Sequence, residues 1–193
     1  MPRKPKTKKV LVLLGSPRKK GNSATLAERI IKGAETAGAT VERVYLHGQN
    51  IAPCNACYAC QKKDSKGCAI DDDMQPIYKK LIESYAWVIA SPVYWFTMSA
   101  QTKLFLDRCF GLFAYKKNVF KGKRIAIAMS YGDADSFSSG CVNALRTFQD
   151  SFTYTGSTIV GMVHGSADKA GEIKTNKRLM GQAEKLGEEL VAG

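Results

Sequence analysis

The sequence predicts an α/β fold in which five parallel strands, in the order 2-1-3-4-5, form one doubly wound sheet with helices on both faces. Short apolar runs alternate along the chain with amphipathic segments of helical period. The apolar runs are nearly continuous, which is typical of strands buried on both faces of a parallel sheet. With 193 residues, 45% hydrophobic content and no internal repeat, the chain is expected to form one domain over residues 9–193.

Each predicted element follows from its apolar pattern and from the residues that end it. The first helix places its apolar residues on one face and ends at Gly38, because glycine is favoured directly after a helix. Asp72 or Asp73 is expected to cap the second helix, and Pro76 falls in its first turn. The predicted strands are Lys9–Gly15, Thr40–Leu46, Ala86–Ser91, Arg124–Tyr131 and Thr158–Val163. The predicted helices lie near residues 22–37, 73–84, 99–112, 138–154 and 174–191.

The segment between the first strand and the first helix, Gly15–Ser23, is a candidate phosphate site. A helix that begins at Asn22 or Ser23 leaves its first amide N–H groups without partners, and the positive end of its dipole favours an anion there. The loop also supplies four side chains that can donate hydrogen bonds to phosphate oxygens. These side chains are Ser16, Arg18, Asn22 and Ser23. The alternative to a phosphate site is that this segment is an ordinary solvated turn rich in Ser, Lys and Arg.

Residue spacing excludes two familiar nucleotide sites. A Walker loop needs four residues between its glycines and then a lysine, whereas five residues separate Gly15 from Gly21 and Asn22 stands in the lysine position. The G-x-G-x-x-G dinucleotide motif is absent, and no carboxylate ends the next strand to bind a ribose. We therefore predict a mononucleotide phosphate held by side chains as well as by the backbone.

Two further loops are expected beside this one, because the carboxyl ends of parallel strands lie at the same edge of a sheet. The loop after the third strand carries the aromatic run Tyr94-Trp95-Phe96, which can lie beside a flat ring; ordinary core packing is the alternative. The loop Ser130–Asp133 contains Gly132, which permits close approach of the backbone. The three loops together predict a ligand site at this edge.

A cysteine loop, residues 54–68, is the sharpest chemical signal of the sequence. Tight C-x2-C-x2-C spacing places three sulfurs on one side of an iron-sulfur cubane, and a fourth cysteine can arrive from further along the loop. Zinc sites more often use two separated C-x2-C pairs. A disulfide, redox-active thiols and zinc remain the alternatives to a 4Fe–4S cluster. The candidate ligands are Cys54, Cys57, Cys60 and Cys68, whereas Cys109 and Cys141 fall in predicted helices and are expected to be buried.

Net charge and hydropathy restrict which partners and which cellular location the sequence predicts. The net charge is +12, and removing the five basic residues among the first nine leaves about +7 for the rest. Residues 1–8 are expected to form a disordered basic arm. A basic body suits anionic small molecules, and the absence of a basic stripe or of basic-aromatic interleaving argues against a nucleic-acid partner. No segment reaches the length of a membrane-spanning helix, so a cytoplasmic protein is expected.

Three segments resemble the NAD(P)H-dependent FMN reductase group of flavodoxin-like proteins: residues 15–23 (GSPRKKGNS), 91–95 (SPVYW) and 103–108 (KLFLDR). The resemblance implies a flavodoxin-like fold and non-covalent FMN, with NAD(P)H as a possible co-substrate. It assigns the FMN phosphate to Ser16, Arg18, Asn22 and Ser23. It assigns the isoalloxazine to Pro92, Val93, Tyr94, Trp95 and Phe96 on one side and to Ser130, Tyr131 and Gly132 on the other. Lys103, Asp107 and Arg108 are expected to be structural, because helical spacing lets them pair on one face.

The cysteine quartet resembles the iron-sulfur flavoproteins, a subgroup in which a compact C-x2-C-x2-C-x(4–7)-C loop holds a 4Fe–4S cluster beside FMN. The seven residues between Cys60 and Cys68 lie at the long edge of that pattern. The resemblance implies an electron-transfer flavoprotein that moves electrons between NAD(P)H or a ferredoxin and an acceptor. A cluster-free NAD(P)H-dependent reductase of quinones, nitro compounds or free flavin is the alternative. A zinc- and nucleic-acid-binding protein is the alternative from another class.

Two further observations complete the expectation. The chain has only two histidines, His47 and His164, and no recognisable Ser-His-Asp or Cys-His motif, which suits flavin chemistry because it needs no protein nucleophile. A run of aromatic residues follows the third helix. If exposed, it suits a homodimer or tetramer interface or a cover for the flavin edge; burial under the sheet edge is the alternative. These residues are Phe110, Phe113, Tyr115 and Phe120.

Overall fold

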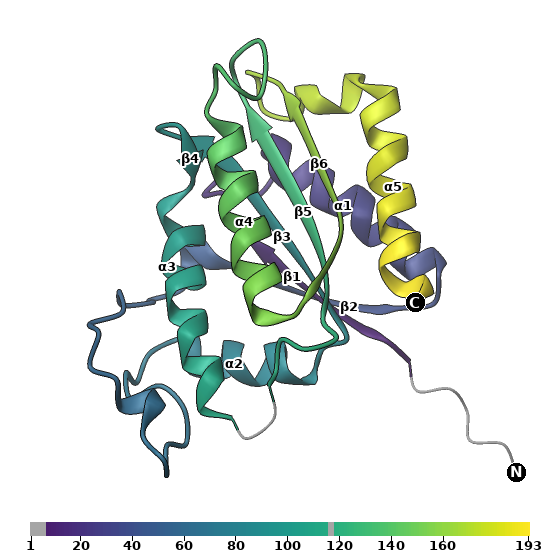
Figure 1. Ribbon diagram of the computed structural model, residues 1–193. Helices are drawn as coiled ribbons and strands as arrows, with labels where there is room; N and C mark the ends of the chain where they lie inside the picture. The colour runs from purple at the N-terminus through teal and green to yellow at the C-terminus, as the bar shows by residue number, and fades with distance from the viewer. Residues whose placement is uncertain (1–6, 116–117) are drawn as a thin grey trace, which may run out of the picture.

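The structure, a computed structural model, describes residues 7–115 and 118–193 (Figure 1). The strands are β1 (Lys9–Leu14), β2 (Thr40–Tyr45), β3 (Ala86–Tyr94), β4 (Thr97–Met98), β5 (Arg124–Tyr131) and β6 (Thr158–Ser166). The helices are α1 (Asn22–Thr36), α2 (Met74–Glu83), α3 (Ala100–Arg108), α4 (Cys141–Thr155) and α5 (Lys177–Ala192). Short 3-10 helices are η1 (Leu46–Gly48), η2 (Ala59–Gln61), η3 (Cys109–Ala114) and η4 (Glu172–Thr175).

The sheet has the flavodoxin-like order that the sequence predicted. Its main path is β2-β1-β3-β5-β6, and every pair along this path is parallel. Because β5 and β6 are the fourth and fifth parallel strands, the predicted order 2-1-3-4-5 is confirmed. The chain leaves β1 toward β2 on one side and returns to β3 on the other, so the strand order reverses there and leaves a crevice at the carboxyl ends.

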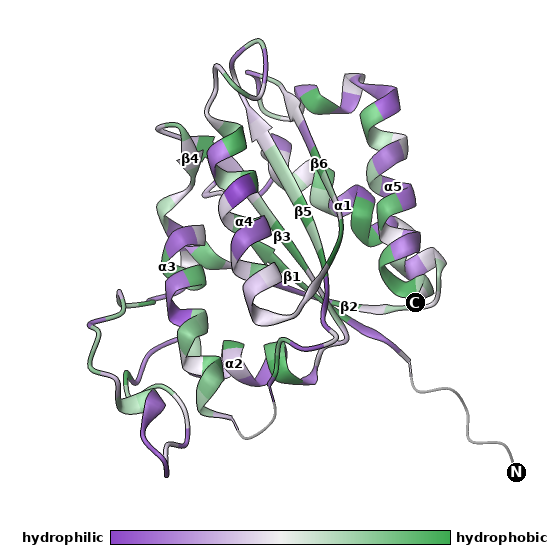
Figure 2. Cartoon of the chain, viewed as in Figure 1, coloured by the Kyte–Doolittle hydropathy of each residue, from purple (hydrophilic) through white to green (hydrophobic). Residues whose placement is uncertain are grey.

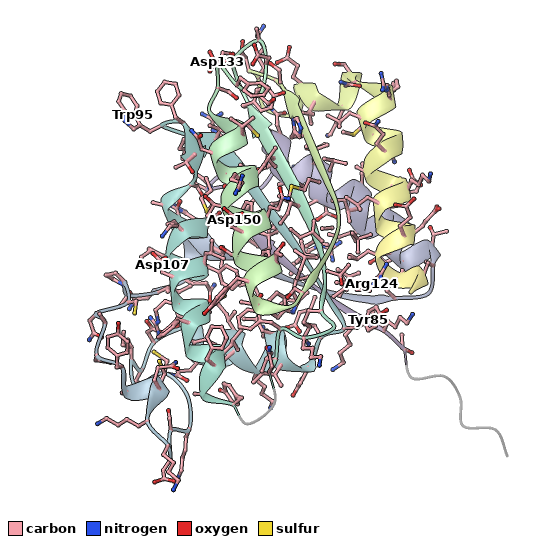
Figure 3. The ribbon with its side chains drawn as sticks, in the orientation of Figure 1. Tyr85, Trp95, Asp107, Arg124, Asp133 and Asp150 are labelled. Atoms are coloured by element: carbon pink, nitrogen blue, oxygen red, sulfur yellow. The ribbon has the colours of Figure 1, made fainter. Side chains whose placement is uncertain are left out.

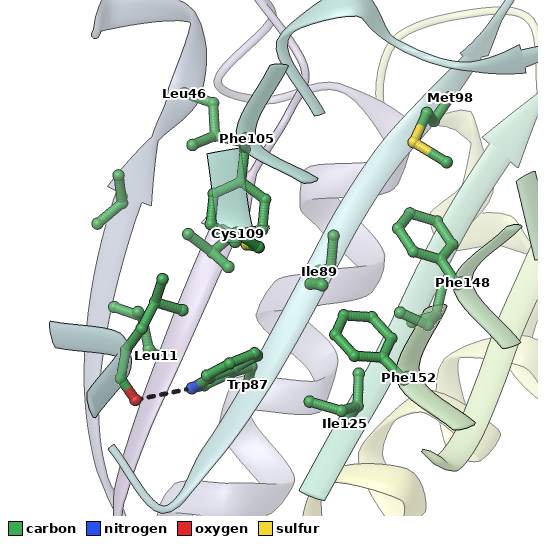
Figure 4. Packing of buried hydrophobic residues seen from close by; sticks show 14 of the residues in the cluster. Leu11, Leu46, Trp87, Ile89, Met98, Phe105, Cys109, Ile125, Phe148 and Phe152 are labelled. Carbon is green, nitrogen blue, oxygen red and sulfur yellow. Dashed lines mark hydrogen bonds between the residues drawn. The ribbon is translucent and has the colours of Figure 1, made fainter. Parts of the chain in front are cut away.

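Helices cover both faces of the sheet, and each face has its own apolar core (Figure 1). Alternate residues of β1 divide between them: Leu11 and Leu13 face α2, α3 and α4, whereas Val10 and Val12 face α1 and α5. Trp87 is fully buried on the first face and donates from Nε1 to the Leu81 carbonyl at 3.2 Å (Figure 4). The central strands are mostly hydrophobic, while α4 and α5 carry hydrophilic residues outward (Figure 2).

Two glycines let α1 and α5 approach each other closely. A Cβ atom at Gly33 would lie 1.9 Å from the Glu184 carbonyl oxygen, and one at Gly187 would lie 1.9 Å from the Ile30 carbonyl oxygen. Both distances are far below van der Waals contact, so any side chain at either position would push the helices apart. The α1–α5 layer therefore depends on these two glycines.

The third strand differs from the prediction. It runs three residues beyond Ser91, because Val93 and Tyr94 pair with β4 in an antiparallel hairpin. Trp95 and Phe96 form the two-residue turn with φ values of 47° and 65°. Positive φ in a two-residue hairpin turn is ordinarily supplied by Gly, Asn or Asp. The predicted aromatic loop is therefore an extension of the sheet.

Helix ends and the amino terminus also refine the prediction. The third helix stops at Arg108 and continues as the 3-10 helix η3, and α1 ends as expected, with Gly38 at φ 86° just beyond it. Most of the predicted basic arm lies outside the described residues, but Lys8 is anchored, since its Nζ donates to the Val191 carbonyl at 2.7 Å. Among the described helices, none is both long and apolar enough to cross a membrane.

Replacement of Gly33 by alanine is expected to destabilise the fold by about 1–3 kcal/mol, because the new methyl group meets backbone atoms that cannot rotate away. The matched control is Gly181→Ala in α5, where nothing lies within 4 Å of the new Cβ. That change is expected to stabilise the protein by about 0.5–1 kcal/mol through helix propensity. Urea unfolding of both variants measures the difference, and equal stabilities would contradict the close helix contact.

Candidate functional site

The carboxyl ends of β1, β3, β5 and β6 border one cavity of about 150 Å³, called here the strand-end cavity. It contains ten of the twelve residues that the sequence assigned to FMN; Trp95 and Phe96 are the two outside it. The lining residues are Ser16, Arg18, Gly21, Asn22, Ser23, Pro92, Val93, Tyr94, Ser130, Tyr131, Gly132, Ala167, Asp168 and Ala170. Loops far apart in sequence thus converge at the place that a doubly wound sheet reserves for ligands.

The first of these loops has the geometry of an anion seat. Arg18 donates its main-chain N–H to Ser16 Oγ at 3.1 Å, and Gly21 donates its N–H to the Arg18 carbonyl at 3.0 Å. This turn delivers the chain to the start of α1, where Gly21 is the N-cap residue and no side chain caps the helix. The first N–H groups of a helix lack intrahelical partners, so they are available to an anion.

Asn22 has a second role that the sequence did not reveal. Its Nδ2 donates to the carbonyls of Ala167 and Lys169, both at 3.0 Å, and its Oδ1 accepts from the Ile173 N–H at 3.3 Å. The side chain therefore ties the first loop to the loop after β6, and Asn22 has its main-chain N–H left to offer a ligand. The loop after β6 was missed as part of the site, although its position after a parallel strand was the signal.

A buried network of hydroxyl groups lies beneath the strand-end cavity. Ser99 Oγ donates to the Gly15 carbonyl at 2.8 Å and lies 2.9 Å from Thr102 Oγ1. The Ser99 N–H donates to Ser91 Oγ at 3.0 Å. The three hydroxyl residues are fully buried, so each bond is formed away from water. The network joins Gly15 after β1, Ser91 within β3 and the start of α3.

The hairpin carries its turn residues away from the strand-end cavity. Trp95 is 91% exposed and projects from the tip (Figure 3), and Phe96 is 55% exposed. The Phe96 carbonyl accepts from Asn143 Nδ2 at 3.0 Å, and Gly140 lies so close that a Cβ there would sit 2.5 Å from the Phe96 oxygen. The hairpin is thus fixed to the start of α4, and Tyr94 is the aromatic residue of the run that borders the cavity.

A second cavity, of about 580 Å³, is lined by all four predicted cluster ligands and is called here the cysteine cavity. Cys54 and Cys57 are exposed, Cys68 is half-buried and Cys60 is buried. All six cysteines of the chain are free thiols, and Cys109 and Cys141 are buried as expected. Within residues 7–115 and 118–193, no three Cys, His, Asp or Glu side chains are grouped closely enough to hold a metal ion.

The loop that carries these cysteines has an unusual backbone. Ala56 and Tyr58 adopt φ values of 54° and 55°, in the left-handed region that non-glycine residues rarely occupy. Gln61 Nε2 donates to Cys60 Sγ at 3.3 Å and to the Phe110 carbonyl at 3.4 Å. Residues 54–58 are therefore exposed and strained, whereas Cys60 is held against η3.

Burial lowers the reactivity of the two cysteines outside the quartet, Cys109 and Cys141. The pKa of the Cys141 thiol is raised to about 11 by burial, so this thiol is neutral and unreactive near neutral pH.

The aromatic run after α3 is only partly exposed. Phe110 and Phe113 are 42% and 38% exposed, while Phe120 is buried. The run thus lies partly on the surface and partly under the sheet edge, and Phe110 and Phe113 border the cysteine cavity.

Arg108 corrects part of the sequence prediction. Lys103 and Asp107 form the expected exposed pair on α3, but Arg108 points inward and pairs with Asp72, outside that face. Its Nη2 donates to Asp72 Oδ1 at 3.1 Å, and its Nη1 donates to Asp72 Oδ2 and to the Ala52 carbonyl, the latter at 2.8 Å. The end of α3 thereby anchors both ends of the cysteine loop.

Electrostatics at this buried pair favour the charged forms. Burial acts to raise the pKa of Asp72, but hydrogen bonds from Arg108 and from the Ala52 and Met74 N–H groups outweigh it and hold the pKa below its ordinary value. Burial acts to lower the pKa of Arg108, and its bonds to Asp72 again outweigh that effect. The pair is therefore ionised throughout the neutral range.

The fold and the two cavities define a flavodoxin-like α/β protein with a cavity at its strand ends, beside the start of α1, and a cysteine quartet near the end of α3. The family described as NADPH-dependent FMN reductase matches residues 8–172. The chain therefore belongs to this family and is an FMN-dependent oxidoreductase.

Relatives of this chain carry both of the names that its motifs indicate. It is 31% identical over 153 residues to an "Iron-sulfur flavoprotein" of Methanosarcina thermophila, with 79% of this chain and 77% of that protein covered. It is 26% identical over 186 residues to "Putative NAD(P)H-dependent FMN-containing oxidoreductase YwqN" of Bacillus subtilis, covering 92% and 96%. The fold is similar to that of an NAD(P)H:quinone oxidoreductase from Methanothermobacter marburgensis, with a TM-score of 0.77, 17% identity, and 97% and 98% coverage.

Replacement of Asp72 by asparagine is expected to cost about 3–5 kcal/mol of unfolding free energy, because Arg108 is left buried without its counter-ion. Asp107→Asn removes the exposed pair with Lys103 and is expected to cost no more than about 1 kcal/mol. Urea unfolding at neutral pH compares the two variants, and equal costs would show that the buried pair does not anchor the fold.

The same comparison has a defined dependence on pH. The folded pKa of Asp72 lies below its ordinary value of 3.8, so its stabilisation is present above that pH and is lost as the pH falls through the folded pKa. The difference in stability between wild type and Asp72→Asn is therefore expected to be constant from pH 5 to 7 and to narrow below about pH 4.

Proposed function

We propose that this protein is an electron-transfer oxidoreductase that uses FMN and a 4Fe–4S cluster to move electrons between a reduced donor, NAD(P)H or a ferredoxin, and an acceptor. The observation that carries the proposal is the presence of two cavities, one at the strand ends beside the start of α1 and one lined by four cysteines. The names of its iron-sulfur flavoprotein relatives support the same pairing.

The strand-end cavity fits the phosphate end of FMN. The start of α1 and the Arg18 guanidinium offer donors to a phosphate, and Ser16 and Ser23 add hydroxyl groups at the same place. In the same cavity, Ser130, Tyr131 and Gly132 would border the flavin ring on one side, and Pro92, Val93 and Tyr94 would border it on the other. In this proposal Trp95 and Phe96 contact the flavin only if the hairpin moves inward.

The chain itself would bind, orient and shield the cofactor. FMN supplies hydride and electron chemistry when bound. The first loop would fix the phosphate, and the hairpin, held by Asn143 and Gly140, would limit water access from one side. The hydroxyl network under Gly15 would keep the separation between the loops constant. No side chain is assigned a proton-transfer role.

The cysteine cavity fits a 4Fe–4S cluster by its donor set, which is four thiols around a space large enough for a cubane. A cluster would be held by Cys54, Cys57, Cys60 and Cys68 and would supply transfer of single electrons. Since Cys54 and Cys57 are exposed, binding requires residues 54–58 to fold inward onto Cys60 and Cys68. The strained backbone of this segment supports such a rearrangement.

A cluster-free NAD(P)H-dependent reductase of quinones, nitro compounds or free flavin is the second candidate. The ungrouped cysteines of the described chain favour it, as does the name of the Bacillus subtilis relative. Membership of an FMN reductase family argues against the zinc- and nucleic-acid-binding alternative. The two oxidoreductase candidates share the FMN site and differ in the role of the cysteine loop.

Assembly and location complete the proposal. Phe110, Phe113 and Tyr154 leave apolar surface beside the cysteine cavity, which favours a homodimer or tetramer. Six free thiols suit the reducing cytoplasm. The acceptor would be a small molecule or a ferredoxin-like protein.

Arg18→Ala is expected to weaken FMN binding by about 10- to 100-fold, because a charge-assisted hydrogen bond to the phosphate is lost. Lys20→Ala removes the same charge from an exposed position outside the cavity and is expected to change the affinity by less than about threefold. Quenching of flavin fluorescence measures the FMN affinity of both variants. Riboflavin, which lacks the phosphate, should bind the two variants equally. An equal loss of FMN affinity in the two variants would contradict the phosphate assignment.

Anaerobic reconstitution with iron and sulfide is expected to load about four irons per chain and to give the visible absorbance of a cluster. Cys57→Ala should lose both signals, whereas Cys141→Ala should keep them because that thiol is buried at the start of α4 and does not line the cysteine cavity. Fewer than about four irons in the wild type would refute the cluster. NADPH oxidation with a quinone that is equal in wild type and Cys57→Ala would favour the cluster-free reductase.

A further inference from the structure

We propose that Arg108 tunes the cluster of the cysteine loop by donating a hydrogen bond from its guanidinium to Cys68 Sγ, which raises the reduction potential of the cluster. This inference rests on the proposed function, since it assigns a role to a residue beside one of the four ligands. In this proposal Arg108 does not contact FMN, and it changes the reduction potential of the cluster through Cys68.

The position of the guanidinium carries the inference. Arg108 is 1% exposed, and its Nη2 lies 3.5 Å from Cys68 Sγ. Within the described chain its Nε is a buried nitrogen without a hydrogen-bond partner. The buried guanidinium thus already directs Nη2 at the sulfur of a predicted ligand, and a thiolate bound to a cluster would accept a stronger, charge-assisted hydrogen bond from it.

The surroundings hold this geometry rigidly. Asp72 binds both terminal nitrogens of the guanidinium, and Tyr78 donates from its hydroxyl to the Arg108 carbonyl at 2.6 Å. Gly111 leaves room for Cys68, because a Cβ at Gly111 would lie 3.2 Å from the Cys68 Cβ. The donor is therefore held in place by Asp72 and Tyr78 before any cluster binds.

The sign of the effect follows from charge. A cluster gains one negative charge on reduction, and a buried donor hydrogen-bonded to a ligand sulfur stabilises that extra charge more than it stabilises the oxidised form. Removal of the donor therefore shifts the potential to more negative values. Removal of the Asp72 charge raises the cluster potential or leaves it unchanged, because the positive guanidinium stays beside the cluster while a negative charge is lost.

The test is an EPR-monitored redox titration of the anaerobically reconstituted wild type, Arg108→Met and Asp72→Asn. Arg108→Met is expected to lower the cluster potential by about 59 mV, a tenfold change in the one-electron equilibrium. Asp72→Asn, which breaks the same ion pair, is expected to leave the potential unchanged or raise it. The potential of FMN in each variant should stay constant.

The outcomes separate tuning from a structural role. A merely structural arginine predicts that both variants loosen the loop and shift the potential in the same direction, which would overturn the proposal, as would no shift in Arg108→Met. If Arg108→Met does not fold, the double variant Arg108→Met/Asp72→Leu replaces the pair by apolar residues, and its cluster potential must fall. Absence of iron in the reconstituted wild type would refute the proposed function itself.

Discussion

The site depends on the contact between Gly15 and the buried hydroxyl groups at the start of α3. A Cβ atom at Gly15 would lie 1.9 Å from Thr102 Oγ1, and the Gly15 carbonyl accepts from Ser99. Gly15 also donates its N–H to the Ala90 carbonyl at 2.8 Å, so β1 and β3 are still paired where the first loop leaves the sheet. The crevice therefore opens immediately beyond this contact. Its floor is fixed by buried hydrogen bonds, which are stronger and less mobile than exposed ones.

Features encoded by local pattern could be predicted from the sequence, and features made by distant pairs could not. The five parallel strands follow from apolar runs, and the strand-end position of ten predicted FMN residues follows from the rule for doubly wound sheets. Arg108 pairs with Asp72, 36 residues away, and helical spacing had instead grouped it with Asp107. The side chain of Asn22 is bound by a loop about 150 residues later. No local signal reports such partners.

The hairpin between β3 and α3 shows the same limit for a different reason. Two-residue hairpins are ordinarily recognised by Gly, Asn or Asp at positive φ, and here Trp95 and Phe96 occupy those positions. Strain of this kind persists only where surrounding contacts determine it, and the contacts are Asn143 and Gly140 against the Phe96 carbonyl. The tertiary fold therefore selects this turn. Its consequence is that Tyr94 borders the strand-end cavity while Trp95 stays exposed.

Helix α3 links the two cavities. Its first turn is capped by Ser99, within the hydroxyl network under the strand-end cavity, and its last residue is Arg108, which anchors the cysteine loop. Nine helical residues rise about 13 Å along the helix axis. Since the helix is bonded at both ends to buried groups, it fixes the distance between the cavities. In the proposed electron-transfer function this helix would keep FMN and the cluster at a constant separation, whereas a cluster-free reductase would place no such demand on Arg108.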